Sequence, residues 1–317
     1  MKININNIII EVLTNRTIIL DILLTKFQID YFSLDQKKYN ILIYEVDYEV
    51  SVELLKKYNV KTTPDTYEYV RKANSFLFES YDTSYVLTDA ENDLIYIYID
   101  TDKRPIEQTI IVKLIKHIYF LLVKYNLYSL HCSCCTTNKS DKLVAFVGNK
   151  HSGKTTLALH FHVHGEKVIC DDSLMIDSES LLAYSNNAPV KAYIDDINIT
   201  HCDQNVIIEN TLPFDNNKYQ VNLKQNQDTK FIKLPDNIII IENEKSNIPD
   251  IKILNSNTLF IELLKRSTIE EYCDNKDYLS LLTQLSRKKG YRLIPSINSN
   301  LTYQLVSETI ARESNDR

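Results

Sequence analysis

The first hundred residues carry short runs of β-branched and aromatic residues, separated by turns that contain Asn and Asp. Such runs occur at residues 8–13, 41–46 and 94–99, and their length and composition are typical of β-strands. In the last run Tyr96 and Tyr98 alternate with isoleucines, as expected for a strand with one buried face. The pattern predicts a strand-rich N-terminal region, residues 1–103. It contains no recognisable catalytic motif, and we interpret it as an accessory or substrate-facing module.

From Pro105 the apolar positions recur every three or four residues, which predicts a helix to about residue 125. The run 143–147 is apolar throughout, as in a strand buried on both faces. A helical segment at 157–161 and a strand at 167–170 follow, so the sequence predicts an α/β catalytic domain over residues 104–317. Further strands are expected at residues 181–184, 190–194, 231–234, 238–241 and 291–294, further helices at 256–265, 278–287 and 299–317, and a polar, Asn-rich stretch at 203–228.

Charge and hydropathy exclude several classes of partner. The chain has 36 Lys and Arg against 42 Asp and Glu, a formal net charge of −6, which is not the basic footprint of a nucleic-acid-binding protein. The longest apolar span, residues 110–123, is interrupted by Lys113, Lys116 and His117 and is shorter than the roughly 20 apolar residues that cross a bilayer. The start lacks a secretory signal pattern. We therefore expect a cytoplasmic protein without a membrane or nucleic-acid partner, and the sequence is compatible with a homo-oligomer.

The six cysteines agree with this compartment. Cys132, Cys134 and Cys135 crowd one short segment, a spacing that matches neither a disulfide framework nor a zinc site. We expect reduced thiols that pack in the core.

Glycine is scarce, and its positions point to one segment. Three of the four glycines, Gly148, Gly153 and Gly165, fall within eighteen residues. Residues 148–155, which we call the glycine loop, satisfy the eight-residue pattern that wraps backbone N–H groups around phosphate oxygens between a strand and a helix. In this pattern Lys154 reaches the β- and γ-phosphates and the Thr155 hydroxyl holds Mg²⁺. The expected nucleotide-binding residues are Gly148, Asn149, Lys150, His151, Ser152, Gly153, Lys154, Thr155 and Thr156.

A pair of carboxylates follows the next predicted strand. Asp171 and Asp172 come directly after residues 167–170, and we expect that strand to lie parallel beside the strand 143–147. Two adjacent carboxylates repel each other, which favours Mg²⁺ at one and raises the pKa of the other toward that of a useful base. His131, which ends or precedes the strand beside this site, is a third candidate.

The succession Leu130-His131, the glycine loop, and Val168-Ile169-Cys170-Asp171-Asp172 resembles the catalytic core of the HPr kinase/phosphorylase family. The likeness is closer to its smaller relatives found with peptide-tailoring enzymes, including those of lasso peptides. The resemblance covers roughly residues 105–300. It implies a P-loop core related to phosphoenolpyruvate carboxykinase, a serine hydroxyl as acceptor, and roles for three residues.

By position in that family, Asp172 looks like the general base, Asp171 like a metal partner, and His131 like a residue that steadies the base. Either aspartate could face the metal. The chain departs from the full family pattern because residues 173–289 contain no glycine, where the bifunctional enzymes carry the segment tied to dephosphorylation. Lys191 is a candidate for a further phosphate contact.

Together these features predict a kinase that uses ATP, or another nucleoside triphosphate, and Mg²⁺ to phosphorylate a hydroxyl of a peptide or small protein. Serine in a ribosomally made precursor peptide is the favoured acceptor. Two alternatives remain open: a kinase of free amino acids or other small hydroxyl compounds, and a regulator or escort that binds ATP without turnover.

Overall fold

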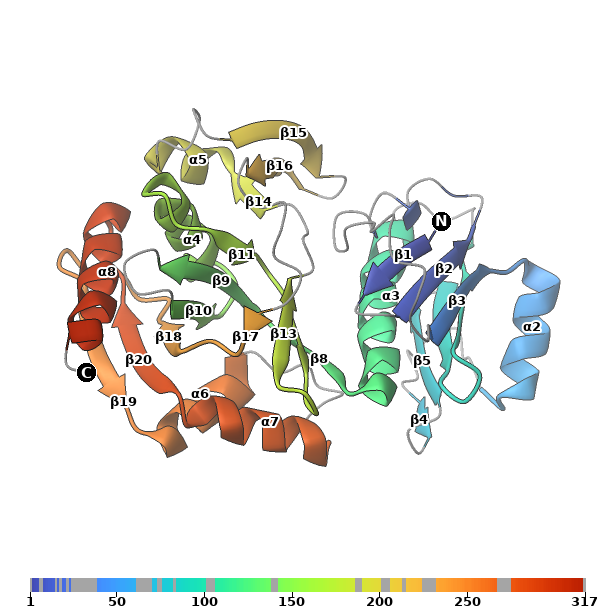
Figure 1. Cartoon of the computed structure of the whole chain (residues 1–317). Coiled ribbons are helices and arrows are strands. Elements are labelled where there is room, and N and C mark those ends of the chain that lie inside the picture. The colour runs from blue at the N-terminus through green and yellow to red at the C-terminus, as the bar shows by residue number, and fades with distance from the viewer. Residues whose placement is uncertain are drawn as a thin grey trace. The chain divides into compact units, whose positions relative to one another are not determined.

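The chain has a mixed α/β architecture in two compact units, residues 1–125 and 126–317 (Figure 1). The computed structural model describes residues 2–5, 8–14, 16, 19–20, 23, 39–60, 70–72, 76–81, 84–100, 106–137, 142–185, 190–200, 206–212, 215–223, 232–266 and 275–315. Among the described residues, no helix combines the length and the apolar character that crossing a bilayer requires.

The first unit is built on a seven-stranded sheet in the order β1-β2-β3-β7-β6-β5-β4. β3 is parallel to both of its neighbours, and the other pairs are antiparallel. The predicted strands at 8–13, 41–46 and 94–99 are confirmed as β2, β3 and β7. The strands are β1 (Lys2–Ile5), β2 (Ile8–Leu13), β3 (Tyr39–Glu45), β4 (Val70–Lys72), β5 (Phe76–Tyr81), β6 (Ser84–Asp89) and β7 (Leu94–Tyr98).

Helix α3 (Ile106–Leu122) belongs by its contacts to this first unit, which ends at Tyr125 and not at the boundary 103/104 expected from the sequence. The helix packs against β5, β6 and β7, and a short 3-10 turn (Val123–Tyr125) ends the unit. Leu114 and Ile118 are buried, as the helical period predicts. The helical spacing of apolar residues identified the helix correctly, but this spacing cannot show which sheet the apolar face of the helix covers.

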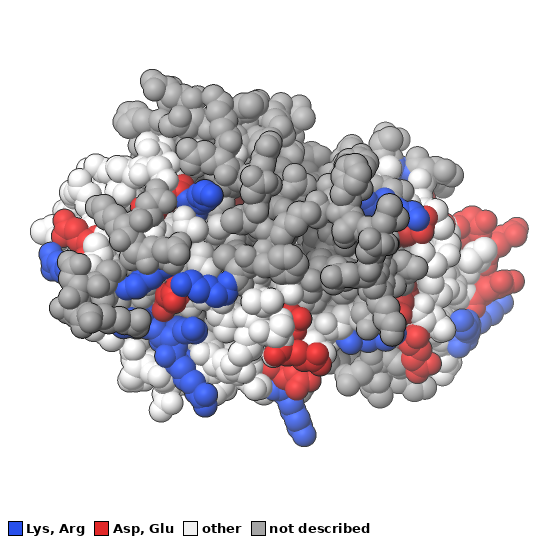
Figure 2. All heavy atoms as spheres, viewed as in Figure 1, with Lys and Arg blue, Asp and Glu red and all other residues white. Residues whose placement is uncertain are grey.

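Helix α2 (Tyr48–Lys57) was not predicted, because its valines and tyrosine resemble the neighbouring strands. Its ends carry ordinary helix signals. The Asp47 side chain accepts a hydrogen bond from the Val50 N–H, and Lys56 and Lys57 occupy the last turn, where they complement the helix dipole. The acidic and basic side chains of α2 form separate groups at the edge of this unit in Figure 2.

The second unit contains a six-stranded sheet in the order β11-β9-β10-β18-β20-β19. β10, β18 and β20 are parallel, so their carboxyl ends meet at one edge. The predicted strand 167–170 forms β11, but it does not lie beside β10. Instead β9 is inserted between them, antiparallel to both. The strands are β9 (Cys132–Thr137), β10 (Lys142–Gly148), β11 (Val168–Cys170), β18 (Asn237–Ile241), β19 (Asp250–Leu254) and β20 (Lys289–Ile294).

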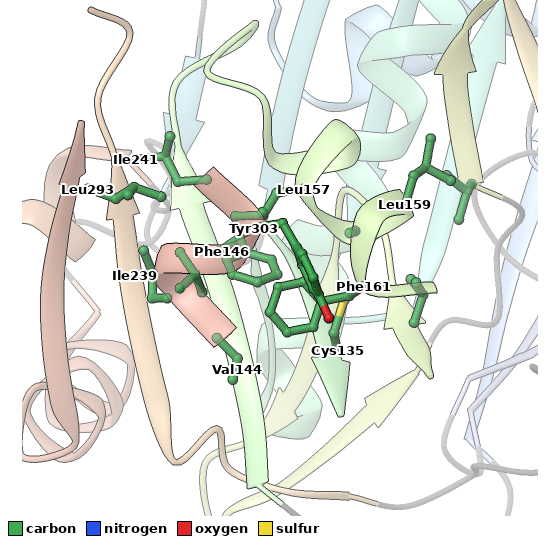
Figure 3. Close-up of a cluster of buried hydrophobic side chains, with 14 of the residues drawn as sticks. Cys135, Val144, Phe146, Leu157, Leu159, Phe161, Ile239, Ile241, Leu293 and Tyr303 are labelled. Carbon is green, nitrogen blue, oxygen red and sulfur yellow. The ribbon is translucent and has the colours of Figure 1, made fainter. Parts of the chain in front are cut away.

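Helices cover both faces of this sheet. On one face, Phe161 of α4 (Lys154–Val163) and Tyr303 of α8 (Ser299–Asn315) pack against Phe146 of β10, with ring centroids 5.1 to 5.3 Å apart in successive pairs (Figure 3). On the other face, α6 (Ser256–Arg266) brings Leu259 so close to Gly290 that a side chain there would collide with it. α6 packs on α7 (Lys276–Ser286).

Two smaller sheets complete the unit, in the orders β17-β13-β12-β8 and β14-β16-β15. β15 (Val206–Leu212) and β16 (Asp215–Leu223) lie in the segment 203–228, which the sequence analysis left without an element. In β16 the buried Val221 and Leu223 alternate with polar residues, so the segment resembles a loop in the sequence. The others are β8 (Leu127–Leu130), β12 (Leu174–Asp177), β13 (Leu182–Ser185), β14 (Val190–Tyr193) and β17 (Ile232–Lys233), and the short helix α5 (Ile194–Thr200) follows β14.

The cysteines of β9 and β11 are free and buried. Burial raises the pKa values of Cys134, Cys135 and Cys170 well above the ordinary value, so these thiols stay protonated and pack as small apolar groups. Cys202 and Cys273 lie outside the described residues.

Candidate functional site

The glycine loop leaves the carboxyl end of β10 and enters α4. A side chain at Gly148 would place its Cβ 2.9 Å from the Ile241 carbonyl oxygen and still closer to the Ser152 hydroxyl, so only glycine fits. Gly153 and His151 have positive φ angles of 96° and 66°. No side chain caps the helix that begins at Lys154. Its first N–H groups and the positive end of its dipole are therefore available to an anion.

Lys154 lies under this loop. Its side chain is largely buried, and Nζ donates hydrogen bonds to the carbonyl oxygens of Gly148 at 2.7 Å and Asn149 at 3.0 Å. Burial lowers the pKa of this ammonium, and the charges of Asp171 and Asp172 act against that shift. The cation is thus held at the loop by carbonyl groups that a phosphate oxygen could replace.

Asp171 is buried and held by three neighbours. Its carboxylate accepts hydrogen bonds from Ser133 Oγ at 2.6 Å, from Thr155 Oγ1 at 3.0 and 3.2 Å, and from the Lys191 N–H at 3.3 Å. Ser133 lies on β9, the strand between β10 and β11. The insertion of β9 therefore supplies a contact that fixes Asp171 beside the first turn of α4.

The Asp172 side chain has different surroundings from those of Asp171. Its backbone has a φ angle of +79°, in the left-handed region, and a third of its side chain is exposed. His131 Nδ1 lies 2.8 Å from the Asp172 carbonyl oxygen and 3.3 Å from Oδ1, and Lys191 Nζ lies 4.0 Å from Oδ2. Because the carbonyl can only accept, Nδ1 of His131 carries the hydrogen of this bond. The two adjacent aspartates thus face different surroundings.

These residues surround one cavity of about 220 Å³. It is smaller than the roughly 300–1,000 Å³ of pockets that enclose a whole small-molecule ligand. All of the predicted site residues line the cavity except Gly148 and Asn149, which lie at the start of the glycine loop. The lining residues are His131, Lys150, His151, Ser152, Gly153, Lys154, Thr155, Thr156, Asp171, Asp172, Lys191, Tyr193, Asp196, Lys218 and Lys245.

Sequence reasoning missed part of this lining: Tyr193 of β14, Asp196 of α5, Lys218 of β16 and Lys245 after β18. Asp196 Oδ1 accepts a hydrogen bond from Thr156 Oγ1 at 2.5 Å and so ties α5 to the start of α4. No motif marks these residues. The strand at 190–194 was expected, but nothing in the sequence indicated that the face with Tyr193 lines the same cavity as the glycine loop.

The donor set fits Mg²⁺. Thr155 and Asp171 offer a hydroxyl and a carboxylate side by side, which are oxygen ligands of the kind this ion prefers, and Mg²⁺ in phosphate sites takes its remaining ligands from water and phosphate. The described residues contain no cluster of three or more His, Cys, Asp or Glu that could hold a metal ion.

The arrangement combines an uncapped helix start, a buried lysine, a hydroxyl–carboxylate pair and a partly exposed carboxylate within one cavity. A comparison with protein-family models finds no match to this chain, and a comparison with curated protein sequences finds none either.

Proposed function

We propose that this chain is a kinase that transfers the γ-phosphoryl group of ATP, or of another nucleoside triphosphate, to a hydroxyl of a peptide or small protein, with serine as the favoured acceptor. The observation that carries the proposal is the Thr155–Asp171 hydrogen bond at the first turn of α4, directly after the glycine loop. A hydroxyl and a carboxylate at this position are the usual partners of a nucleotide-bound Mg²⁺. The second unit would then be a P-loop core of the HPr-kinase-like kind.

The chain's own groups account for nucleotide binding in this proposal. The N–H groups of the glycine loop and of the α4 start face the phosphates, and Lys154 exchanges its two carbonyl partners for β- and γ-phosphate oxygens. Thr155 and Asp171 would hold Mg²⁺, which when bound neutralises charge on the β- and γ-phosphates. This assigns the metal side to Asp171, because its carboxylate is the one in contact with Thr155.

Asp172 then serves as the general base. It is the more exposed aspartate, and His131 and Lys191 orient it. The acceptor hydroxyl gives its proton to the Asp172 carboxylate, and its oxygen forms a bond to the γ-phosphorus. The bond between that phosphorus and the β–γ bridging oxygen breaks, and the nucleoside diphosphate leaves with the bonding electrons. A cytoplasmic setting and an acceptor other than nucleic acid agree with the free thiols and the net charge.

The test is phosphate transfer from radiolabelled ATP to a panel of serine peptides, small proteins and free amino acids. We expect Lys154→Ala to lose both nucleotide binding and transfer, and Asp172→Asn to keep binding but lose at least 100-fold in transfer, as typical for a missing general base (about 10²–10⁴-fold). Lys252→Ala and Asp250→Asn, which alter an exposed ion pair on β19, serve as matched controls. Transfer by Lys154→Ala or Asp172→Asn at the control rate would refute the proposal.

The same experiment separates the alternatives. Transfer to free amino acids but not to peptides would identify a small-molecule kinase. Binding of ATP that depends on Lys154, with no transfer or hydrolysis across the panel, would identify a regulator without turnover.

A further inference from the structure

Strand β19 forms one edge of the six-stranded sheet in the second unit (Figure 1). It pairs with β20 on one side, and among the described residues no strand pairs with its other side. An open edge of this kind can pair with a strand of another chain. Which strand fits depends on the direction of the backbone groups and side chains of β19.

The hydrogen bonds of the sheet determine which backbone groups of β19 point to the open edge. The Glu242 N–H donates to the Leu293 carbonyl oxygen at 2.9 Å, so the backbone groups of Leu293 point to β18 and away from β19. Ile251 lies opposite Leu293 in the antiparallel pairing of β19 with β20. Two such residues turn their N–H and C=O groups away from each other. The N–H and C=O groups of Ile251, and those of Ile253 two residues later, therefore point to the open edge.

The two faces of β19 differ in chemistry. Ile251 packs against the apolar cluster shared by α4 and α8, and Ile253, on the same face, is 81% exposed. Asp250 and Lys252 lie on the opposite face, where their exposed side chains form an ion pair of 2.9 Å. Pro249 precedes the strand and has no N–H, which shortens the part of the edge that can pair. A partner strand therefore has to match one apolar face and one face with a charge of each sign.

A second copy of β19 matches both faces. When two antiparallel copies pair around a two-fold axis at Ile251, each Ile251 N–H donates to the Ile251 carbonyl oxygen of the other copy. On one face the exposed Ile253 then lies opposite Pro249 of the second copy. On the other face Asp250 lies opposite Lys252 of the second copy, so both pairs join opposite charges. An axis at Lys252 would place two lysines opposite each other, and an axis at Ile253 would leave both charges without a counterpart.

We propose that the chain forms a homodimer in which the β19 edges of two copies pair in this register and join the two six-stranded sheets. The pairing uses the same open edge of both copies, so assembly stops at the dimer. The dimer is independent of the proposed kinase function, because no residue of β19 lines the cavity. Nucleotide binding and phosphate transfer should therefore be the same in the dimer and in the monomer.

The test reverses one charge at a time and measures the mass of the protein by sedimentation velocity over a wide range of concentrations. In Asp250→Lys, like positive charges lie opposite each other across the axis, and in Lys252→Asp, like negative charges do. Each variant also loses the ion pair within its own chain, so the two are matched. Circular dichroism and nucleotide affinity show whether each variant is folded.

We expect the wild type to form dimers and each variant alone to dimerise at least about tenfold more weakly, because two attractive charge pairs per dimer become repulsive. An equal mixture of the two variants should recover dimers that contain one copy of each, since every charge then lies opposite a charge of the other sign. Neither variant has an ion pair within its own β19, so this recovery can come only from contacts between the copies in the proposed register.

A monomeric wild type overturns the proposal. So does a dimer that both variants retain with the strength of the wild type, because the copies would then meet at another surface. If the mixture stays as monomeric as each variant alone, the proposed register is wrong. Asp250→Arg and Lys252→Glu carry the same charges and repeat the test if a variant of the first pair does not fold. The proposed kinase function fails by a different result, the absence of phosphate transfer in monomer and dimer alike.

Discussion

The hydrogen bond between His131 and the backbone of Asp172 leads to a specific prediction about the activity of His131 variants. His131 Nδ1 donates to the Asp172 carbonyl oxygen at 2.8 Å, and Asp172 has a φ angle of +79°. A left-handed backbone costs a residue with a Cβ about 1–2 kcal/mol. Removing the hydrogen bond should therefore let the backbone of Asp172 relax and turn the carboxylate away from the acceptor.

The size of the effect follows from this single bond. A hydrogen bond in a protein contributes a net stabilisation of about 0.5–1.5 kcal/mol, which corresponds to about a twofold to tenfold loss of rate in His131→Ala. His131→Asn should keep most of the activity, since the Asn amide nitrogen occupies nearly the place of Nδ1 and donates as it does. His131→Gln places its amide farther out and should behave like His131→Ala.

The assay is the steady-state rate of phosphoryl transfer for the three variants, with nucleotide affinity measured separately. We expect kcat to fall in the Ala and Gln variants while the affinity for ATP stays constant, because the phosphate side of the cavity is untouched. If His131→Asn lost as much activity as His131→Ala, the imidazole ring itself would be required, and the positioning argument would be wrong. Wild-type activity in His131→Ala would refute it as well.

Three further predictions concern nucleotide binding and stability. Gly148→Ala should abolish nucleotide binding in calorimetry while the fold persists by circular dichroism, because the new Cβ meets the Ile241 carbonyl at 2.9 Å and the loop has to move. Phe161→Ala should lower the free energy of unfolding by about 3–5 kcal/mol in urea titrations, since the ring is almost fully buried between two aromatic neighbours. Burial alone would raise the pKa of Glu79, but the hydrogen bond from Lys116 and the neighbouring His117 ring, whose Nε2 lies 3.6 Å from Oε2, outweigh burial and lower the pKa to about 2. The stabilisation that the ionised Glu79 gives the folded state is complete above its unfolded pKa of about 4.5 and is lost as the pH falls toward 2. Glu79→Gln should therefore lower the free energy of unfolding by about 3 kcal/mol at pH 7 and by much less at pH 3. Equal losses at both pH values would contradict this assignment.

The residues of the glycine loop could be identified from sequence because their geometry is local. Gly148 and Gly153 are needed where the backbone leaves β10 and enters α4, and eight consecutive residues are enough to define that path. The position of Asp171 and Asp172 after a short buried strand was also readable. The sequence could not distinguish the two aspartates, whereas the structure does, because Thr155 donates a hydrogen bond to Asp171.

The order of strands was predicted incorrectly. The succession of strand, helix and strand suggested that β11 lies directly beside β10, as in a simple crossover. The earlier strand β9 takes that place instead, and its Ser133 becomes a partner of Asp171. A contact between residues 38 positions apart leaves no local pattern in the chain.

The features that depend on chain neighbours were readable from the sequence: the glycine loop with its Thr155 hydroxyl, the two carboxylates after the next buried strand, and the period of each apolar segment. The contacts between distant segments came only from the fold: α3 packs in the first unit, β9 separates β11 from β10, and Lys191, Tyr193 and Lys218 line the same cavity as the glycine loop. The physical reason is that backbone conformation and helix or strand period depend on neighbours in the chain. Strand order and the pairing of polar faces depend on which apolar surfaces bury one another across the fold.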